Sequence, residues 1–407
     1  MADSTVVATL TELVAIPSIG GTEGEAAIQH RLAERLGDLG LEVDLWPIDL
    51  ADLRQRADYP GEEVERTAAW GLVATNQPGE RPALILQGHV DVVPTGDPAA
   101  WTSEPFRPQV SGGRVIGRGA CDMKGGVAAI LEAVQTVQQA GSSGPPYAVH
   151  FVVGEEDGGL GAYATLARGH GGDACIIPEP TSLGLVTANA GSLTFRIKVP
   201  GLATHGSTRY AGSSAIDSYL PIHRALAELE RRRNVEVEPL MQGYPVPYPL
   251  SVGRVRAGDW ASSVPDLLVA EGRFGLYIEE EPASARAELE AAVAEAAEHD
   301  PYLREHPPGV SWSGGQFRGG RLPAGHAFGS RLADLHRRVT GRELGPGRGV
   351  SYGSDLRLYA GAGIPTLHYG PGSPREAHGP DESVPIEEVV TASKVLALAV
   401  QSAGTPG

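Results

Sequence analysis

Apolar side chains recur at helical spacing in two segments near the start of the chain, residues 5–16 and 23–39. Each segment is followed by a proline or a glycine, residues that commonly end a helix. Short apolar runs then occupy residues 83–87, 147–153 and 174–177, and a segment between the first two runs repeats apolar residues at helical spacing. Strands that alternate with helices predict an α/β domain with a largely parallel central sheet flanked by helices.

The pattern of apolar and polar residues changes near residue 190. From there it predicts a half-exposed strand, a helix, a mixed strand region, a second helix and a final strand, over residues 193–199, 214–231, 267–278, 283–299 and 310–317. We interpret this order as β-α-β-β-α-β, which is typical of a small α+β domain.

The α+β domain is predicted to be an insertion into the α/β domain, at residues 190–318. The α/β domain would then comprise residues 1–189 and 319–407, and it would resume with a helix over residues 327–339. A chain of 407 residues is long enough for this organisation and for a large core.

Acidic residues outnumber basic ones by 50 to 33, which leaves a formal net charge of -17 at pH 7. This charge repels nucleic-acid phosphates and anionic membrane surfaces, so we expect neither as a partner. A small anionic substrate is still compatible with it, because a local arginine or metal ion outweighs distant, screened charge.

Cys121 and Cys175 are too few for a disulfide framework and are typical of a reducing compartment. The first residues resemble no cleavable leader, and nowhere do 18 apolar residues run without interruption. We therefore expect a soluble, cytoplasmic protein.

Each apolar run of the first domain ends near a side chain that can bind a metal ion. The first run leads to His89 and Asp91, the second to Glu155 and Glu156, and the third to Glu179. In open α/β sheets, ligands bind beyond the carboxyl ends of the strands. We therefore expect these side chains to converge in one crevice.

Taken singly, these residues also have structural interpretations. The segment after Glu155 is typical of an exposed turn, His89 of a hydrogen-bonded histidine at a strand end, and Asp122 of a helix cap. Their joint occurrence with a late His378-Gly-Pro-Asp-Glu segment is harder to attribute to turns and caps. Such a ligand set could hold two divalent ions, with zinc expected and cobalt or manganese as alternatives.

These residues resemble the motifs of the dinuclear zinc aminoacylase and carboxypeptidase family, which includes acetylornithine deacetylase, succinyl-diaminopimelate desuccinylase and glutamate carboxypeptidase. The resemblance spans most of the chain. The motifs are Gly88-His89-Val-Asp91-Val-Val-Pro94, Gly117-Arg-Gly-Ala-Cys-Asp122-Met-Lys-Gly-Gly126, Glu155-Glu156, Pro178-Glu179-Pro180 and His378-Gly-Pro-Asp-Glu382.

The resemblance implies a metal-binding role for five of these side chains. His89 and Glu179 would bind one ion, and Glu156 and His378 would bind the other. Asp122 would bridge the two ions.

The resemblance also implies catalytic roles. Asp91 would orient the His89 imidazole, and Glu155 would act as general base and acid. In the family the inserted domain is a lid that forms a homodimer, and a lid histidine contacts the scissile carbonyl, often across the dimer. His205 occupies the similar position here, with an exposed loop histidine as the alternative.

Four residues are predicted to bind substrate on the strength of the same resemblance. Ser262 stands where many relatives have asparagine, and Arg273 resembles a lid arginine that binds a carboxylate, although its spacing from Pro265 is shorter. Gly353 and Asp355 lie in a segment similar to a late active-site loop. The alternatives are a strand-surface arginine and a plain turn.

The predicted function is a metal-dependent amidohydrolase that cleaves the N-acyl amide of an N-acyl amino acid or related amine, as acetylornithine deacetylase does. A dipeptidase or carboxypeptidase, or an N-succinyl, N-formyl or N-carbamoyl amidohydrolase, would use the same site. A non-catalytic, metal-stabilised binding protein is a further alternative. A dinucleotide site at Gly117 to Asp122 is rejected, because the third glycine is missing and an acid stands at the start of the helix.

Overall fold

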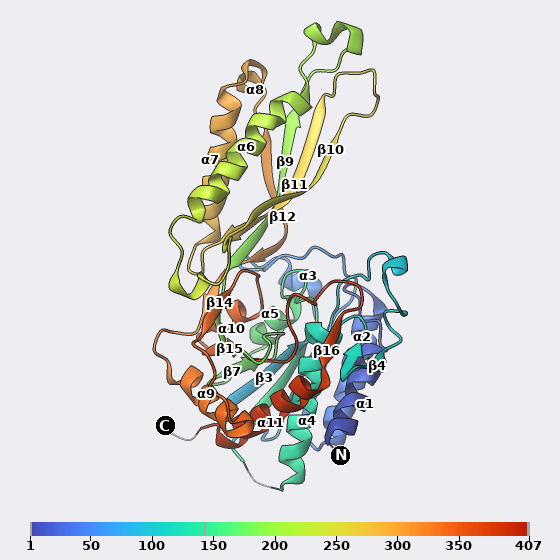
Figure 1. Ribbon diagram of the computed structural model, residues 1–407, viewed down its shortest axis with the longest axis vertical. Coiled ribbons are helices and arrows are strands. Elements are labelled where there is room, and N and C mark those ends of the chain that lie inside the picture. The colour runs from blue at the N-terminus through green and yellow to red at the C-terminus, as the bar shows by residue number, and fades with distance from the viewer. Residues whose placement is uncertain (1, 142–143, 405–407) are drawn as a thin grey trace. The chain divides into compact units, whose positions relative to one another are not determined.

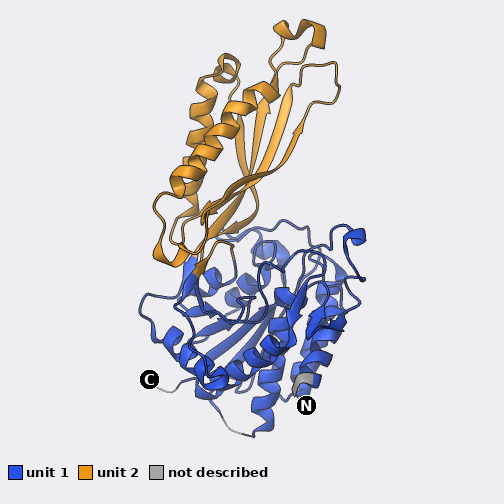
Figure 2. Cartoon of the chain, viewed as in Figure 1, with its two compact units in different colours: residues 1–188, 320–348, 354–407 blue, residues 189–319, 349–353 orange. Residues whose placement is uncertain are grey.

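The computed structural model describes residues 2–141 and 144–404, which form two compact units (Figure 1). Unit 1 comprises residues 1–188, 320–348 and 354–407, and unit 2 comprises residues 189–319 and 349–353 (Figure 2). The insertion predicted at residues 190–318 did not include the short second segment of unit 2. A role of unit 2 as a lid or dimerisation domain stays a prediction.

A mixed sheet with a parallel centre is the framework of unit 1. Its order is β1-β2-β6-β3-β7-β15-β8-β13, and β14 also pairs with β8. The strands are β1 (Glu42–Pro47), β2 (Trp70–Thr75), β3 (Leu84–His89), β6 (Tyr147–Val152), β7 (Cys175–Ile177), β8 (Val186–Asn189), β13 (Gly320–Arg321), β14 (Arg348–Val350) and β15 (Thr366–His368). The pairs β6 with β3, β3 with β7, and β7 with β15 are parallel, as expected for an α/β domain. The predicted fold class is confirmed.

Helices cover both faces of this sheet because successive residues of its central strands are apolar and buried. In β3, Leu84 and Leu86 pack in one core cluster with Val127, whereas Ile85 packs in another with Tyr359. The helices are α1 (Ala2–Val14), α2 (Glu23–Asp38), α3 (Leu50–Leu53), α4 (Gly125–Gln139), α5 (Leu160–Ala167), α9 (Ala327–Thr340), α10 (Leu356–Gly361) and α11 (Ile386–Ser402). Figure 1 shows α4 beside α11.

A small three-stranded sheet in unit 1 holds the segments that flank the late histidine motif. Its order is β16-β5-β4, and all of its pairs are antiparallel. The strands are β4 (Gln109–Ser111), β5 (Arg114–Ile116) and β16 (Ser383–Pro385). The sheet therefore brings the chain just after His378 next to the chain just before Asp122.

Unit 2 is a four-stranded antiparallel sheet covered on one face by two long helices (Figure 1). The strand order is β10-β11-β9-β12. The elements are β9 (Gly191–Pro200), α6 (Ala215–Arg233), β10 (Leu250–Ala257), β11 (Leu267–Leu276), α7 (Pro282–Glu298), α8 (Pro301–Glu305) and β12 (Gly309–Phe317). The apolar pattern did not locate β10, because it is an edge strand with mostly exposed side chains.

A helix needs about 20 mostly apolar residues to cross a bilayer, and this requirement applies to the helices of residues 2–141 and 144–404. None of them is both long enough and apolar enough to cross a membrane.

Candidate active site

Three neighbouring strands of unit 1 deliver predicted ligands to one edge of the sheet. His89 is the last residue of β3, Glu155 and Glu156 lie in the turn after β6, and Glu179 follows β7. Because β6, β3 and β7 are adjacent and parallel, their carboxyl ends meet at this edge. The structure therefore brings together side chains that are up to 90 positions apart, as His89 and Glu179 are.

Asp122 lies between two imidazoles. One of its carboxylate oxygens is 3.2 Å from Nε2 of His89, and the other is 3.4 Å from Nε2 of His378. The His378 Nε2 is also 3.1 Å from the Glu156 carboxylate, and the His89 Nε2 is 3.9 Å from that of Glu179. Each imidazole thus faces one terminal carboxylate and shares Asp122 with the other imidazole.

The donor set of this site fits divalent cations. Two triads, His89 with Asp122 and Glu156, and His89 with Glu155 and Glu179, have ligand atoms within 4.8 Å of one another. Imidazole nitrogens and carboxylate oxygens at such separations are the donors that zinc and similar ions bind in proteins.

The electrostatics of the same side chains lead to the same conclusion. Burial and neighbouring acids raise the pKa values of Glu155 and Glu179 well above the ordinary carboxyl range, and they also raise the pKa of Glu156. Hydrogen bonds to Asp122 and Glu156 raise the pKa of His378 to about 11. Crowded carboxyl groups that repel one another in a buried place are stabilised by a cation.

Asp91 holds the turn that carries the glutamate pair. Its two carboxylate oxygens accept the backbone N–H groups of Glu155 and Glu156, each at 3.2 Å. The His89 Nδ1 lies 3.0 Å from the main-chain oxygen of Asp91 and 3.7 Å from its carboxylate. The group at hydrogen-bond distance from His89 is therefore the Asp91 carbonyl, whereas the carboxylate lies within ion-pair range, and its orienting role stays a prediction.

Two further residues of the motifs, Glu382 and Arg118, support the site. The buried Glu382 carboxylate accepts the backbone N–H groups of Gly119, Cys121 and Asp122 at 2.9 to 3.0 Å. It also pairs with Arg118 at 2.6 Å, and Arg118 donates to the main-chain oxygen of His378 at 3.1 Å. Glu382 and Arg118 therefore fix the positions of both Asp122 and His378.

Asp355 has no exposed surface. Its Oδ2 accepts a hydrogen bond of 2.9 Å from the Gln87 side chain. Burial raises the pKa of Asp355 to about 6. The predicted contact of Asp355 with substrate is therefore corrected to a fully buried position that is bonded to Gln87.

The other predicted substrate contacts lie in unit 2. Ser262 meets the exposed His205 loop, where its carbonyl accepts the Gly206 N–H at 2.6 Å. Arg273 donates to the main-chain oxygen of Ser351 at 2.8 Å. A Cβ on Gly353 would lie 2.5 Å from the ring of Phe317, so that close approach favours glycine.

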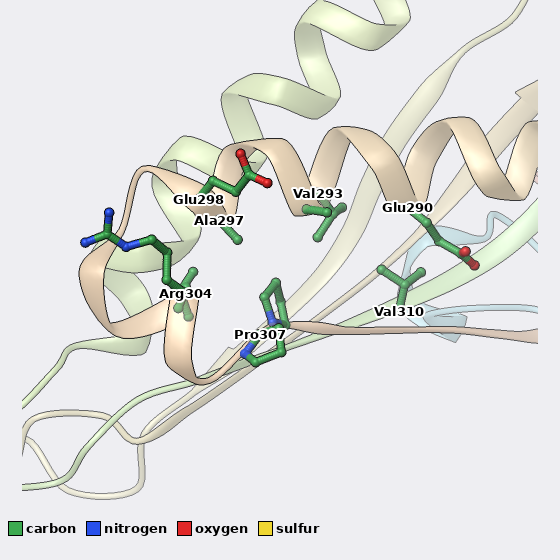
Figure 3. Close-up of a pocket in the computed structure, with 10 residues that line it drawn as sticks. Glu290, Val293, Ala297, Glu298, Arg304, Pro307 and Val310 are labelled. Atoms are coloured by element: carbon green, nitrogen blue, oxygen red, sulfur yellow. The ribbon is translucent and has the colours of Figure 1, made fainter.

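Unit 2 also contains a groove of about 840 Å³ between α7, α8 and β12 (Figure 3). Val293, Ala297 and Val310 are among the residues that line it. None of the predicted site residues lines this groove, and both possible metal-binding triads of the described chain lie in unit 1. We therefore assign the chemistry to the edge of the unit 1 sheet.

Curated proteins of known name are similar to this chain over most of its length. The N-formyl-4-amino-5-aminomethyl-2-methylpyrimidine deformylase of Bacillus subtilis is 30% identical over 404 residues, which cover 93% of this chain and 89% of the relative. Acetylornithine deacetylase of Photorhabdus laumondii is 26% identical over 396 residues, which cover 95% and 94% of the two chains.

A solved structure shares the fold over nearly the whole chain. The M20 family metallo-carboxypeptidase Sso-CP2 of Sulfolobus solfataricus has a TM-score of 0.75 and 17% identity, with 97% of this chain and 98% of the other covered. A profile of the family described as Peptidase family M20/M25/M40 matches residues 85–402. The resemblance inferred from the motifs is thereby confirmed. The chain belongs to the peptidase family M20/M25/M40 and is a hydrolase that acts on amide bonds.

Proposed function

We propose that this chain is a metal-dependent amidohydrolase that cleaves the N-acyl amide of an N-acyl amino acid or a related amine. The observation that carries this proposal is the position of Asp122 between His89 and His378, with the glutamate pair beside it. The relatives named for deformylation and deacetylation support an acyl amide as the substrate class.

Two divalent ions are proposed to bind at this site, with zinc expected and cobalt or manganese as alternatives. His89 and Glu179 would hold one ion, Glu156 and His378 the other, and Asp122 would contribute one oxygen to each. When bound, such ions supply Lewis-acid polarisation of a carbonyl and lower the pKa of water.

Glu155 is proposed as the group that moves the proton. Asp91 fixes its backbone N–H, and burial keeps its pKa above the ordinary carboxyl range. A carboxyl group with a raised pKa can accept a proton from the attacking water and then release it to the leaving amine near neutral pH. His205 is proposed to contact the scissile carbonyl, and Ser262, Arg273 and Gly353 to contact the remainder of the substrate.

An N-formyl amine is the second candidate substrate. It is favoured by the name of the Bacillus subtilis relative, which is 30% identical over 93% of this chain. Dipeptides or the carboxyl-terminal bonds of peptides are a third class on the same site, since one solved structure with this fold is named a carboxypeptidase. The proposed metal ligands are common to all of these candidate substrates. The group on the acyl side of the amide therefore distinguishes them.

We also propose a homodimer that forms through unit 2, in a reducing, cytoplasmic compartment. Large apolar side chains are exposed on unit 2, including Tyr210 at 86% and Trp260 at 72% of their surface. Nine of the ten large apolar side chains that are exposed in the described residues lie in unit 2, and this concentration supports a protein contact surface there. Cys121 and Cys175 are both buried and free, as expected where thiols stay reduced.

The proposal is tested by the activity of the metal-loaded protein on formylated, acetylated and succinylated amino acids and on dipeptides. A chelator should abolish the activity, and zinc or cobalt should restore it. Glu155→Gln should keep the bound metal but lower kcat by about 10² to 10⁴, the usual contribution of a general acid and base. Glu132→Gln, on α4, serves as the matched control.

Near-normal turnover by Glu155→Gln would remove Glu155 from its role. Elemental analysis that finds no bound transition metal after reconstitution would reject the metal-dependent mechanism. Activity on dipeptides alone would shift the assignment to the third substrate class.

A further inference from the structure

A buried arginine outside the motifs connects two distant carboxylates in unit 1. Arg66 lies between α3 and β2, and its side chain has an exposed fraction of 0%. Its Nη1 donates to Asp157 at 2.7 Å, and its Nη2 donates to Glu25 at 2.9 Å. Both carboxylates are also nearly fully buried, with exposed fractions of 7% and 4%.

Asp157 directly follows the glutamate pair, and its side chain bonds to the segment of residues 63–66. Its Oδ2 accepts the backbone N–H groups of Glu63 and Val64 at 3.2 and 2.9 Å, in addition to the Arg66 hydrogen bond. The turn is thus bonded both to the segment of residues 63–66, through Asp157, and to Asp91, through its backbone N–H groups.

The Arg66 guanidinium is also held by its second carboxylate partner, Glu25. Glu25, in the first turn of α2, accepts from Nε and Nη2 of Arg66 and also from the backbone N–H of Gly21. A guanidinium held between two carboxylates has a fixed plane and direction. Helix α2 therefore determines where Asp157, and with it the turn, is placed.

We infer that Arg66 is a positioning residue for the Glu155-Glu156 turn, and that the Glu25-Arg66-Asp157 network holds the proposed general base and an adjacent metal ligand in place. This inference rests on the proposed function of Glu155 and Glu156. Arg66 touches neither substrate nor metal in this role, and it acts only through Asp157.

The position of this network favours a role in placing the active-site turn over a role in stability alone. Asp157 is one residue from Glu156 and two from Glu155, so a shift of its carboxylate moves both side chains. Reacting groups must be held within fractions of an ångström, and a displacement of about 1 Å can cost about 10²-fold in rate. Glu25 and Arg66 also precede the segment matched by the family profile, which starts at residue 85.

The test compares Arg66→Met with Arg66→Lys and with a matched control. Arg233→Met is the control because Arg233 is also buried, at an exposed fraction of 1%, and pairs with two carboxylates, Glu280 and Glu288, inside unit 2. Both methionine variants remove a buried cation that pairs with two carboxylates, so both should be less stable. Only Arg66→Met should change the turn.

Two readouts separate positioning from loss of stability. Hydrogen–deuterium exchange of residues 153–160 should accelerate by at least about tenfold in Arg66→Met, because these amide hydrogen bonds would open locally, and it should be unchanged in Arg233→Met. At saturating metal and below the unfolding temperature, kcat of Arg66→Met should fall by about 10- to 100-fold, while KM changes by less than about threefold. Arg66→Lys should recover part of both effects.

Unchanged exchange and unchanged kcat in folded Arg66→Met would overturn the inference. Equal losses in Arg66→Met and Arg233→Met would also overturn it, because they would indicate general destabilisation. If the parent protein hydrolyses none of the amides tested, the proposed function fails, whereas the exchange experiment still decides whether Arg66 holds the turn.

Discussion

Burial controls the charge of individual side chains in this protein, both inside and outside the site. His150 on β6 has no exposed surface, and its Nδ1 lies 2.9 Å from the Tyr359 hydroxyl. Burial, together with the nearby His170, lowers the pKa of His150 to about 3. A histidine of this kind stays neutral in the folded protein and becomes charged only when the chain unfolds.

The neutral His150 makes stability depend on pH. Its pKa is about 3 in the folded protein and 6.5 ordinarily, so between these values the unfolded chain binds one more proton. The free energy of unfolding should therefore fall as the pH drops through this window, by about 1.4 kcal/mol per pH unit for this group. Urea unfolding of the metal-free protein at several pH values between 4 and 6.5 measures this slope.

His150→Gln should reduce the slope by that amount while keeping a hydrogen bond to Tyr359. The exposed His306→Gln is the control. A slope that is the same in His150→Gln and the parent would show that His150 is not the group responsible.

The residues of the site differ in how far a sequence reveals them. His89, Asp122, Glu155, Glu156 and Glu179 could be predicted, because strand-end positions and motif spacing point to them. The Arg66 network could not, since its members are 41 and 91 positions apart and no local pattern links them. Asp355 was placed in the substrate site because a motif gives the neighbourhood of a residue but not its burial.

At the scale of elements, close backbone contacts set the position of the segment after β7, which carries Glu179. Gly126, in the first turn of α4, packs against the main chain of Pro178, and an added Cβ would lie 2.2 Å from the Pro178 oxygen. Gly370 approaches the same oxygen from another side, also at 2.2 Å for an added Cβ. The segment that carries Glu179 is therefore held between two glycines.

A pair of helical glycine substitutions tests this packing. Gly126→Ala should lower the free energy of unfolding by about 1 to 3 kcal/mol, because the methyl group forces the backbone apart. Gly37→Ala, in α2, should raise it by up to about 1 kcal/mol, since an added Cβ there meets nothing within 4 Å. Urea or thermal unfolding measures both, and an unchanged or raised stability of Gly126→Ala would contradict the argument.

Two segments of unit 2 that the apolar pattern does not predict share a physical cause. The alternation of apolar residues in β10 shifts at a bulge between Val252 and Arg254, and the segment of residues 349–353 is too short to show a period, so the place of both is decided by pairing with distant chain segments. The helices near residues 2–14, 23–38 and 327–340 could be predicted within a few residues, because their apolar faces have a clear helical period.

At the scale of the whole molecule, the proposed dimer and the proposed role of His205 can be tested together. If His205 serves the site of a second copy, a mixed dimer of Glu155→Gln and His205→Ala contains one complete site. Random exchange of subunits should then restore roughly one quarter of the parent activity from two inactive variants.

Subunits should be exchanged under mild denaturation, and the activity should be measured after reassembly. Sedimentation velocity provides the control for dimer formation. No recovery of activity in a sample that is shown to contain mixed dimers would place the His205 contact within a single chain.

Strand β2 lies between β1 and β6 in the sheet, outside the segment of residues 85–402 that the family profile matches. A fragment trimmed to that segment would leave the fully buried β6 as a bare edge, and bare apolar edges pair with those of other molecules. It would also leave Asp157 without its cation. Truncation at the profile boundary should therefore yield insoluble aggregates, since the unit that folds is longer than the segment that the family profile matches.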